Sequence, residues 1–332
     1  MMDGAAHRHR KRMFLTFLAD ETHLSSLRAA FRKEWLKAAA GWELRREVRF
    51  FDEVNLVLTR TAVSWAGIPD EFERPIQLCR ALADMVANAG NIGPKAWLAL
   101  LRRSKVERQL RSFVQALRAE TYSADGSPAH VVVTHRDLDR RLLTEEVAAV
   151  EILNILRPTL AIGRYLVFCA LALERHPDLR RAIASGDESL LRPFVEEVRR
   201  VYPFFPFIGG RARQAFHWRD YVIPAGSWVL LDLFGTNRDP RRYEAPEAFR
   251  PGQAPNWETL DFGFVPQGGG DPGVTHRCPG EAATVVLMME ATRLLCRSIS
   301  YDVPPQDLNI NLRRIPTAPR SGMVLCNVRL LI

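Results

Sequence analysis

The stretch PQGGGDPGVTHRCPGE, residues 266–281, carries the most specific pattern in the chain. Four glycines precede Cys278 and Gly280 follows it. Glycine lets a backbone adopt positive φ values and approach a flat ligand closely. A helical pattern continues from Glu281, so Cys278 stands at a helix N-terminus, where amide N–H groups and the helix dipole favour a thiolate. The loop therefore predicts either a thiolate metal ligand or a buried structural cysteine beside a glycine-rich turn, and alone it does not decide between them.

A charged pair precedes this loop in the helix FVEEVRRVYP, residues 194–203. Glu197 and Arg200 are three positions apart, so they share one helical face. Most such pairs are solvated and contribute little to stability. Followed by a β hairpin and a cysteine loop, however, the pair becomes informative.

The remaining pattern is helical over the first two thirds of the chain and mixed afterwards. Apolar spacing predicts helices over 9–18, 24–42, 51–66, 75–89, 98–118, 145–174, 190–201 and 280–298. Strands are expected at 221–223 and 227–233 around a turn, and at 299–303 and 323–331. Residues 126–131 are the most loop-like part of the helical region. We expect one domain over 1–332, mainly α with a small β portion (α+β), helical over 1–205 and mixed over 206–332.

Composition excludes several classes of protein. The 332 residues are 47% hydrophobic and 25% charged, as in ordinary globular chains, and no apolar run is long enough to predict a membrane span. The basic N-terminus is not followed by a signal-type apolar segment. Five separated cysteines without a CxxC pair indicate a reducing, cytoplasmic location and argue against a zinc site or a disulfide scaffold. The net charge of +8 is explained by solvated arginines, and no nucleic-acid partner is expected.

Together the ExxR pair and the cysteine loop resemble the cytochrome P-450 superfamily, and more closely its bacterial fatty-acid peroxygenase and decarboxylase branch. The resemblance runs along nearly the whole chain. It is carried by MDGAAHRHRK (2–11), LNILRPTLAI (153–162), EVRRVYPFFPF (197–207), VLLDLFGTNRDP (229–240), FVPQGGGD (264–271), HRCPGE (276–281) and YDVPPQDL (301–308). It implies a cytochrome P-450 fold, haem b with Cys278 as the thiolate ligand of the iron, and hydrogen peroxide as co-substrate. Such a thiolate favours cleavage of an O–O bond.

Arg157 and Pro158 distinguish that branch within the superfamily. Arg157 stands in an apolar helix and has no acidic neighbour one turn away, and a buried guanidinium without an anion is costly. Pro158 lacks the amide that would bond to the Asn154 carbonyl, so it should kink the helix. The resemblance implies that other members carry an acid–alcohol pair here, and that in this branch the fatty-acid carboxylate binds the arginine and replaces the acid. Without the resemblance, an ion pair with a distant acid or exposure to solvent is the simpler interpretation.

The resemblance also implies residues at the haem propionates. His7 and Lys11 match the C-helix residues that bind propionates, although HRHRKR also fits a frayed basic terminus. His276 and Arg277 are placed to meet the same groups. The segment 204–207 matches the part of the family that lines the haem pocket, while ordinary core packing explains it equally well.

Two departures from the family pattern stand out. The chain begins at what resembles the C helix, so we expect the N-terminal part of the fold to be absent and apolar surface to be exposed. In addition, FRPGQAP places Gly252 and Gln253 where the family has an acid and an arginine, with Arg250 as the nearest substitute. We therefore expect the segment before the cysteine loop to be held more weakly.

The sequence thus predicts a haem–thiolate peroxygenase that oxidises long-chain fatty acids near the carboxylate, by α or β hydroxylation or by decarboxylation. Arg157 and Pro158 are the predicted catalytic residues, His7, Lys11, His276 and Cys278 the haem-binding residues, and Cys278 the metal ligand. No electron-transfer partner is required for peroxide chemistry. The alternatives are a reductase-dependent cytochrome P-450 monooxygenase and, from another class, a truncated and inactive haem-binding protein.

Overall fold

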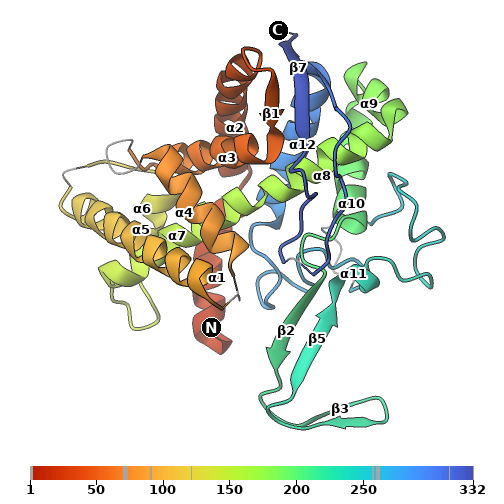
Figure 1. Ribbon diagram of the computed structural model, residues 1–332. Helices are drawn as coiled ribbons and strands as arrows, with labels where there is room; N and C mark the ends of the chain where they lie inside the picture. The colour runs from red at the N-terminus through yellow and green to blue at the C-terminus, as the bar shows by residue number, and fades with distance from the viewer. Residues whose placement is uncertain are drawn as a thin grey trace.

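The computed structural model describes residues 3–69, 74–89, 92–120, 122–255, 258, 262–313 and 315–331 (Figure 1). The helices in this part of the chain are α1 (Gly4–Leu18), α2 (Glu21–Trp42), α3 (Phe50–Ala66), α4 (Pro75–Ala87), α5 (Pro94–Arg118), α6 (Pro128–Thr134), α7 (Glu145–Ala161), α8 (Gly163–Arg175), α9 (Pro177–Ala184), the 3₁₀ turn η1 (Glu188–Leu190), α10 (Leu191–Val201), α11 (Leu233–Thr236) and α12 (Glu281–Arg297). The strands are β1 (Glu47–Arg49), β2 (Phe207–Arg211), β3 (Phe216–Trp218), β4 (Tyr221–Ile223), β5 (Trp228–Asp232), β6 (Ile299–Asp302) and β7 (Val324–Leu330).

Helices α7 and α8 run through the middle of the molecule, with the other long helices around them (Figure 1). The stretch Glu145–Arg175 is long and apolar enough to cross a membrane by length and composition alone. However, 83% of its apolar window is buried inside the fold, as expected for a core helix of a globular protein. Its apolar character is therefore explained by packing against neighbouring helices.

The helix predicted over 145–174 is divided at Ile162, four residues after Pro158. The Thr159 hydroxyl, next to Pro158, donates to the Ile155 carbonyl over 2.8 Å, one turn earlier in α7. At the start of α8, Gly163 lies directly against Asn55, where an added Cβ would stand 2.4 Å from Oδ1. The close approach requires glycine and fixes α8 against α3.

The sequence predicted the positions of strands β4, β5, β6 and β7 better than it predicted which strands pair with each other. The expected turn between β4 and β5 suggested that these two strands pair, which is wrong: β5 pairs with β2, and β4 pairs with β3, both antiparallel. Nearly all residues of this double hairpin are exposed, and Figure 1 shows it projecting from the helical body. The third sheet, in the order β1-β7-β6, lies beside α2 and α3.

Several helix boundaries also differ from the sequence prediction. The stretch 126–131, expected as a loop, contains the start of α6, and α9 was not predicted. The Ser127 hydroxyl accepts a bond from the His130 amide over 3.2 Å, and Pro128 occupies the first turn of α6. Ser followed by Pro is a helix-start signal, so the composition of this stretch was misinterpreted.

Candidate active site

Cys278 lines an apolar cavity of about 490 Å³ that lies between α7 and the start of α12. The Cys278 amide donates to the Gln267 carbonyl over 3.0 Å, which closes the glycine-rich loop. Ala283 and Thr284 of α12 continue the same wall. Cys278 and residues of α7 therefore line one apolar cavity.

Two glycines of the loop are required by geometry. Gly268 has φ +97°, and an added Cβ would lie 3.1 Å from the Arg277 Cα atom. Gly270 has φ +80°, and a Cβ there would lie 2.8 Å from the Thr275 methyl group. Both conformations are costly for residues with a Cβ. The glycines thus let the loop fold back onto the segment that carries Cys278.

The surroundings of Cys278 shift the pKa of its thiol in two opposite directions. Burial raises the pKa of the Cys278 thiol, while the Gly280 amide and the Gln267 side chain act in the opposite direction. A buried thiol stays protonated until a metal ion displaces its proton. The amide at the helix start then stabilises the resulting thiolate.

A buried ionic network supports the loop, and the sequence analysis missed it. Arg277 donates to Glu281 over 2.6 Å, and Glu281 also pairs with Arg199 of α10. Arg199 pairs in addition with Glu196, and all four side chains are buried. Arg277 also donates to the Gly270 carbonyl at 3.2 Å, so its guanidinium supports the cysteine loop. The available signal was the i,i+3 spacing of Glu196 and Arg199, identical to that of the ExxR pair.

The ExxR pair itself is fully buried, unlike most pairs at this spacing. Arg200 donates two bonds of 2.8 Å to Glu197. Its guanidinium also donates to main-chain carbonyls of the segment 237–253, which we call the meander, at 3.1 Å for Asn237, 2.8 Å for Pro246 and 2.8 Å for Ala248. The pair therefore connects α10 to the segment that leads into the cysteine loop.

The missing family arginine after FRP is partly replaced. The Arg250 amide, not its guanidinium, donates to Glu197 over 2.8 Å. The Gln253 side chain approaches the same carboxylate oxygen at 3.5 Å and donates to the Ala245 carbonyl at 3.3 Å. The expectation that this segment is held weakly must therefore be corrected, because main-chain groups supply most of the contacts.

Arg157 and Pro158 of α7 line the side of the cavity opposite the cysteine loop. In the part of the chain that the structure describes, Arg157 forms no ion pair, so the alternative of a distant acidic partner is not supported there. Its guanidinium donates to the Asn154 side chain over 3.1 Å. Burial lowers the pKa of Arg157, and the nearby Arg103 acts in the same direction. Glu107, which pairs with Arg103, acts in the opposite direction. The cavity thus holds a half-buried cation that forms no ion pair with a described residue.

A polar chain holds Asn154 in turn. The Asn154 amide donates to Glu151 over 2.9 Å, and Glu151 accepts from Arg10 over 2.5 Å. Arg10 also pairs with Asp137 over 2.6 Å. This network connects α1 to α7, and it could not be found from spacing because its members are distant in sequence.

The predicted propionate residues gather at the start of α1. The helix begins at Gly4, so His7 and Lys11 do not belong to a frayed terminus. The His7 ring lies 4.1 Å from the His276 ring, and burial lowers the pKa of His7. Lys11 is buried, with a lowered pKa, and donates to the carbonyls of Thr275 at 2.6 Å and of Arg277. The structure therefore brings His7, Lys11 and His276 beside the cysteine loop.

The aromatic segment after α10 divides between two environments. Phe204 and Phe205 line the cavity, and the Phe204 ring lies 4.9 Å from the Tyr165 ring. Phe207 lies on β2 with 42% of its surface exposed, so its inclusion in the pocket was wrong. The chain turns outward into the hairpin at this point.

Comparison with known proteins agrees with this geometry. The family model described as Cytochrome P450 matches residues 188–299, which contain the ExxR pair and the cysteine loop. The structure of cytochrome P450SP alpha (CYP152B1) in complex with (R)-ibuprofen superposes with a TM-score of 0.92 at 39% identity, covering 99% of this chain and 81% of that one. The chain belongs to the cytochrome P450 superfamily.

Two further cytochromes P450 show how far the similarity extends. The structure of a variant of cytochrome P450 OleT in complex with arachidonic acid gives a TM-score of 0.93 at 30% identity, covering 100% of this chain and 79% of that one. Among curated proteins, the cytochrome P-450 monooxygenase DoxA of Streptomyces peucetius subsp. caesius is 37% identical over 102 residues, 30% of this chain and 22% of that protein. The structural relatives therefore place this cytochrome P450 in the CYP152 peroxygenase branch.

Membership of this superfamily implies a haem whose iron is bound by a cysteine thiolate, and the site fits such a group. The cavity is apolar, lies within the size range of cofactor pockets and includes Cys278 in its wall. Glycines 268 and 270 permit the close main-chain path beneath it. His7, Lys11 and His276 collect positive and hydrogen-bonding groups beside the cysteine loop, where anionic propionates require them.

Proposed function

We propose that this cytochrome P450 is a peroxygenase that oxidises long-chain fatty acids next to the carboxylate, with hydrogen peroxide as the oxidant. One observation carries the proposal: Arg157 lines the cavity opposite Cys278 and forms no ion pair in the described part of the chain. A planar guanidinium binds a carboxylate through two parallel hydrogen bonds. A fatty acid therefore supplies the anion that Arg157 lacks, and its chain fills an apolar cavity.

Each cavity residue has a defined task in this proposal. Cys278 provides the thiolate for the haem, which supplies the oxidising chemistry when bound. Arg157 orients the substrate carboxylate, and that carboxylate holds the proton needed during O–O cleavage, because the residues at 157–159 include no acid. Pro158 withholds an amide from the Asn154 carbonyl and shapes the wall beside Arg157.

The reaction is balanced without an external reductant. One C–H bond of the fatty acid and one O–O bond of the peroxide break, a C–O bond and a new O–H bond form, and water is released. His7, Lys11 and His276 are proposed to hold the propionates and orient the haem. No electron-transfer protein enters this scheme.

The test compares Arg157→Ala with the parent protein in peroxide-driven oxidation of a long-chain fatty acid. A charge-assisted hydrogen bond contributes about 1.5–3 kcal/mol, so fatty-acid binding should weaken by roughly 10–150-fold. Positioned acid–base catalysis contributes about 10²–10⁴ in rate, so turnover at saturating substrate should also fall. Arg111→Ala is the matched control, because Arg111 is a cation of the neighbouring helix α5 that pairs with Glu146 and does not line the cavity.

A second measurement separates acid–base chemistry from simple binding. A short carboxylic acid should promote oxidation of a substrate without a carboxylate in the parent and in Arg111→Ala, but not in Arg157→Ala. Oxidation of fatty acids by Arg157→Ala at the parental rate would make Arg157 structural. Activity that requires a reductase and dioxygen would favour the monooxygenase alternative, and haem binding without turnover would favour an inactive haem-binding protein.

A further inference from the structure

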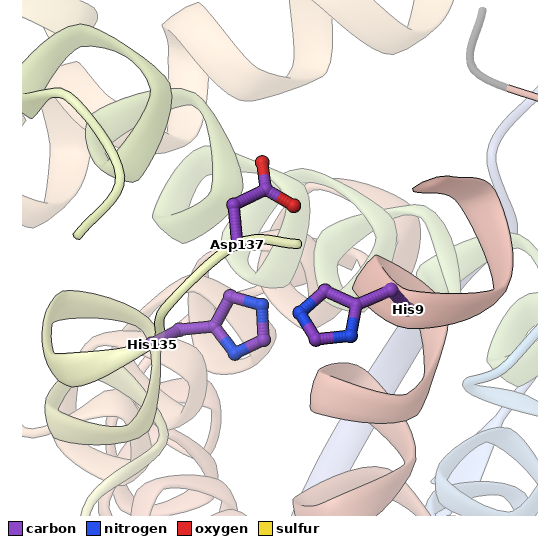
Figure 2. A group of neighbouring side chains, drawn as sticks. All are labelled: His9, His135 and Asp137. Atoms are coloured by element: carbon purple, nitrogen blue, oxygen red, sulfur yellow. The ribbon is translucent and has the colours of Figure 1, made fainter. Parts of the chain in front are cut away.

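A second group of possible metal ligands lies outside the cavity. His9 of α1 faces His135 and Asp137, which follow the end of α6, and the candidate ligand atoms of the three side chains lie within 4.8 Å of one another. Figure 2 shows a ring nitrogen of each histidine directed at the other ring. The cluster joins parts of the chain more than 120 residues apart, which explains why sequence spacing did not predict it.

The histidine nitrogens are suited to bind a metal ion. The His135 Nε2 atom is buried and has no hydrogen-bond partner in the described structure, and such an orphaned atom is costly. The His9 Nε2 atom donates to the Arg136 carbonyl over 2.9 Å. The ring centroids are 4.9 Å apart. Burial lowers the pKa of His135, and the neutral imidazole is the form that binds a metal ion.

Asp137, the third member of the cluster, supplies negative charge. Asp137 pairs with Arg10 over 2.6 Å and accepts a bond from the Leu138 amide over 3.0 Å. Arg10 has a second carboxylate partner, Glu151, at 2.5 Å. When Asp137 turns toward a metal ion, Glu151 therefore still compensates the buried Arg10 charge.

From this geometry we propose that His9, His135 and Asp137 form a site for a divalent transition-metal ion, for which zinc is the probe. Zinc accepts imidazole nitrogen and carboxylate oxygen at about 2.0–2.2 Å. In a tetrahedral site two ligands of one ion are about 3.3–3.6 Å apart, so the cluster must close by up to about 1.5 Å through side-chain rotation. The proton on His9 Nε2 moves to Nδ1, and the Arg136 carbonyl or a water molecule completes the tetrahedron.

This site lies outside the haem cavity and takes no direct part in the proposed oxidation, but it shares Asp137 with the network of Arg10. It fastens α1, which carries His7 and Lys11, to the segment after α6. A metal ion that binds the folded chain and not the unfolded chain raises the unfolding temperature as its concentration exceeds Kd. The expected role is therefore to hold α1 in place.

The experiment uses the untagged, haem-loaded chain after dialysis against a chelator. Equilibrium dialysis against zinc chloride, with elemental analysis per mole of protein, should show one bound zinc, and the Tm should rise with zinc concentration. His135→Ala and, separately, His9→Gln should each weaken zinc binding by at least roughly 100-fold, since loss of outer-shell partners alone costs 10–100-fold. Both variants should keep the parental Tm in chelator, which shows that they fold.

The matched control is His130→Ala, which removes a histidine that pairs with Asp125 outside the cluster. It should bind zinc like the parent. Absence of bound zinc in the parent overturns the proposal. It is equally overturned if binding survives His135→Ala but is lost in His276→Ala, because the metal would then occupy the His7–His276 pair.

Discussion

Asn154 accepts a hydrogen bond of 3.1 Å from Arg157 and is itself held by Glu151, so the cavity arginine is positioned by a network that reaches α1. Arg10 is the centre of that network, because it pairs with both Glu151 and Asp137. The orientation of a cavity residue on α7 therefore depends on a side chain of α1.

Replacing Arg10 should be strongly destabilising. Arg10→Met leaves the buried Glu151 carboxylate without its cation, and removal of one partner of a buried pair costs about 3–5 kcal/mol. Urea unfolding measures this loss. Arg12→Met is the control on the same helix, since Arg12 is exposed and its replacement should change stability by less than about 0.5 kcal/mol. Equal effects of the two variants would show that the Arg10 network contributes nothing specific.

Cys278→Ala should abolish thiolate ligation. The parent, reduced and exposed to carbon monoxide, should give the red-shifted Soret band of a thiolate-bound haem. Cys169→Ala should retain that band, because Cys169 is buried within α8, where desolvation raises the pKa of its thiol to about 12. A persistent red-shifted band in Cys278→Ala would assign the ligand to another residue.

Replacing a member of the ExxR pair should destabilise the protein much more than replacing the neighbouring Gln253. Arg200→Met leaves Glu197 buried and unpaired and should cost about 3–5 kcal/mol. Gln253→Ala removes three long contacts, of 3.2 and 3.3 Å to Ala245 and of 3.5 Å to Glu197, so the loss should stay within about 0.5–1.5 kcal/mol. Denaturant midpoints and haem retention after gel filtration measure both. A larger loss for Gln253→Ala would mean that this side chain, and not the main chain, holds the meander.

Stability should fall in acid partly through Glu188. Hydrogen bonds from Arg293, then Arg297, lower the pKa of Glu188 to about 2. A lowered carboxyl pKa contributes stability above the unfolded value of about 4.3, and that contribution is lost as the pH falls toward 2. The urea midpoint of the parent should therefore decrease between about pH 4.5 and 3 more steeply than that of Glu188→Gln. If the urea midpoints of the parent and of Glu188→Gln fall equally steeply with pH, solvent screens the exposed pairs of Glu188 with Arg293 and Arg297.

The sequence was most informative where chemistry and local spacing coincide. Cys278, the Glu197–Arg200 pair and the Arg157–Pro158 dipeptide could be recognised because each is a short motif, and the structure gathers them around one cavity or its support. The fold class followed from the long helical periodicities. Strand pairing was misassigned because a turn after β4 does not specify which strand pairs with β5.

The contacts that sequence analysis missed are made between residues that lie far apart in the sequence. Arg10, Glu151 and Asp137 meet only after α1, α7 and the segment following α6 are packed together. The same is true of the His9–His135–Asp137 cluster. Sequence separations of this size carry no spacing signal, so only the folded chain reveals these contacts.

The meander is bound by Arg200 through the carbonyl oxygens of Asn237, Pro246 and Ala248. Every amino acid carries that carbonyl, so the anchor does not depend on most side chains of the segment. Mutations in the meander can therefore accumulate during evolution with little penalty, while Glu197 and Arg200 stay constrained. The departure from the family pattern at Gly252 and Gln253 leaves all three of these bonds in place.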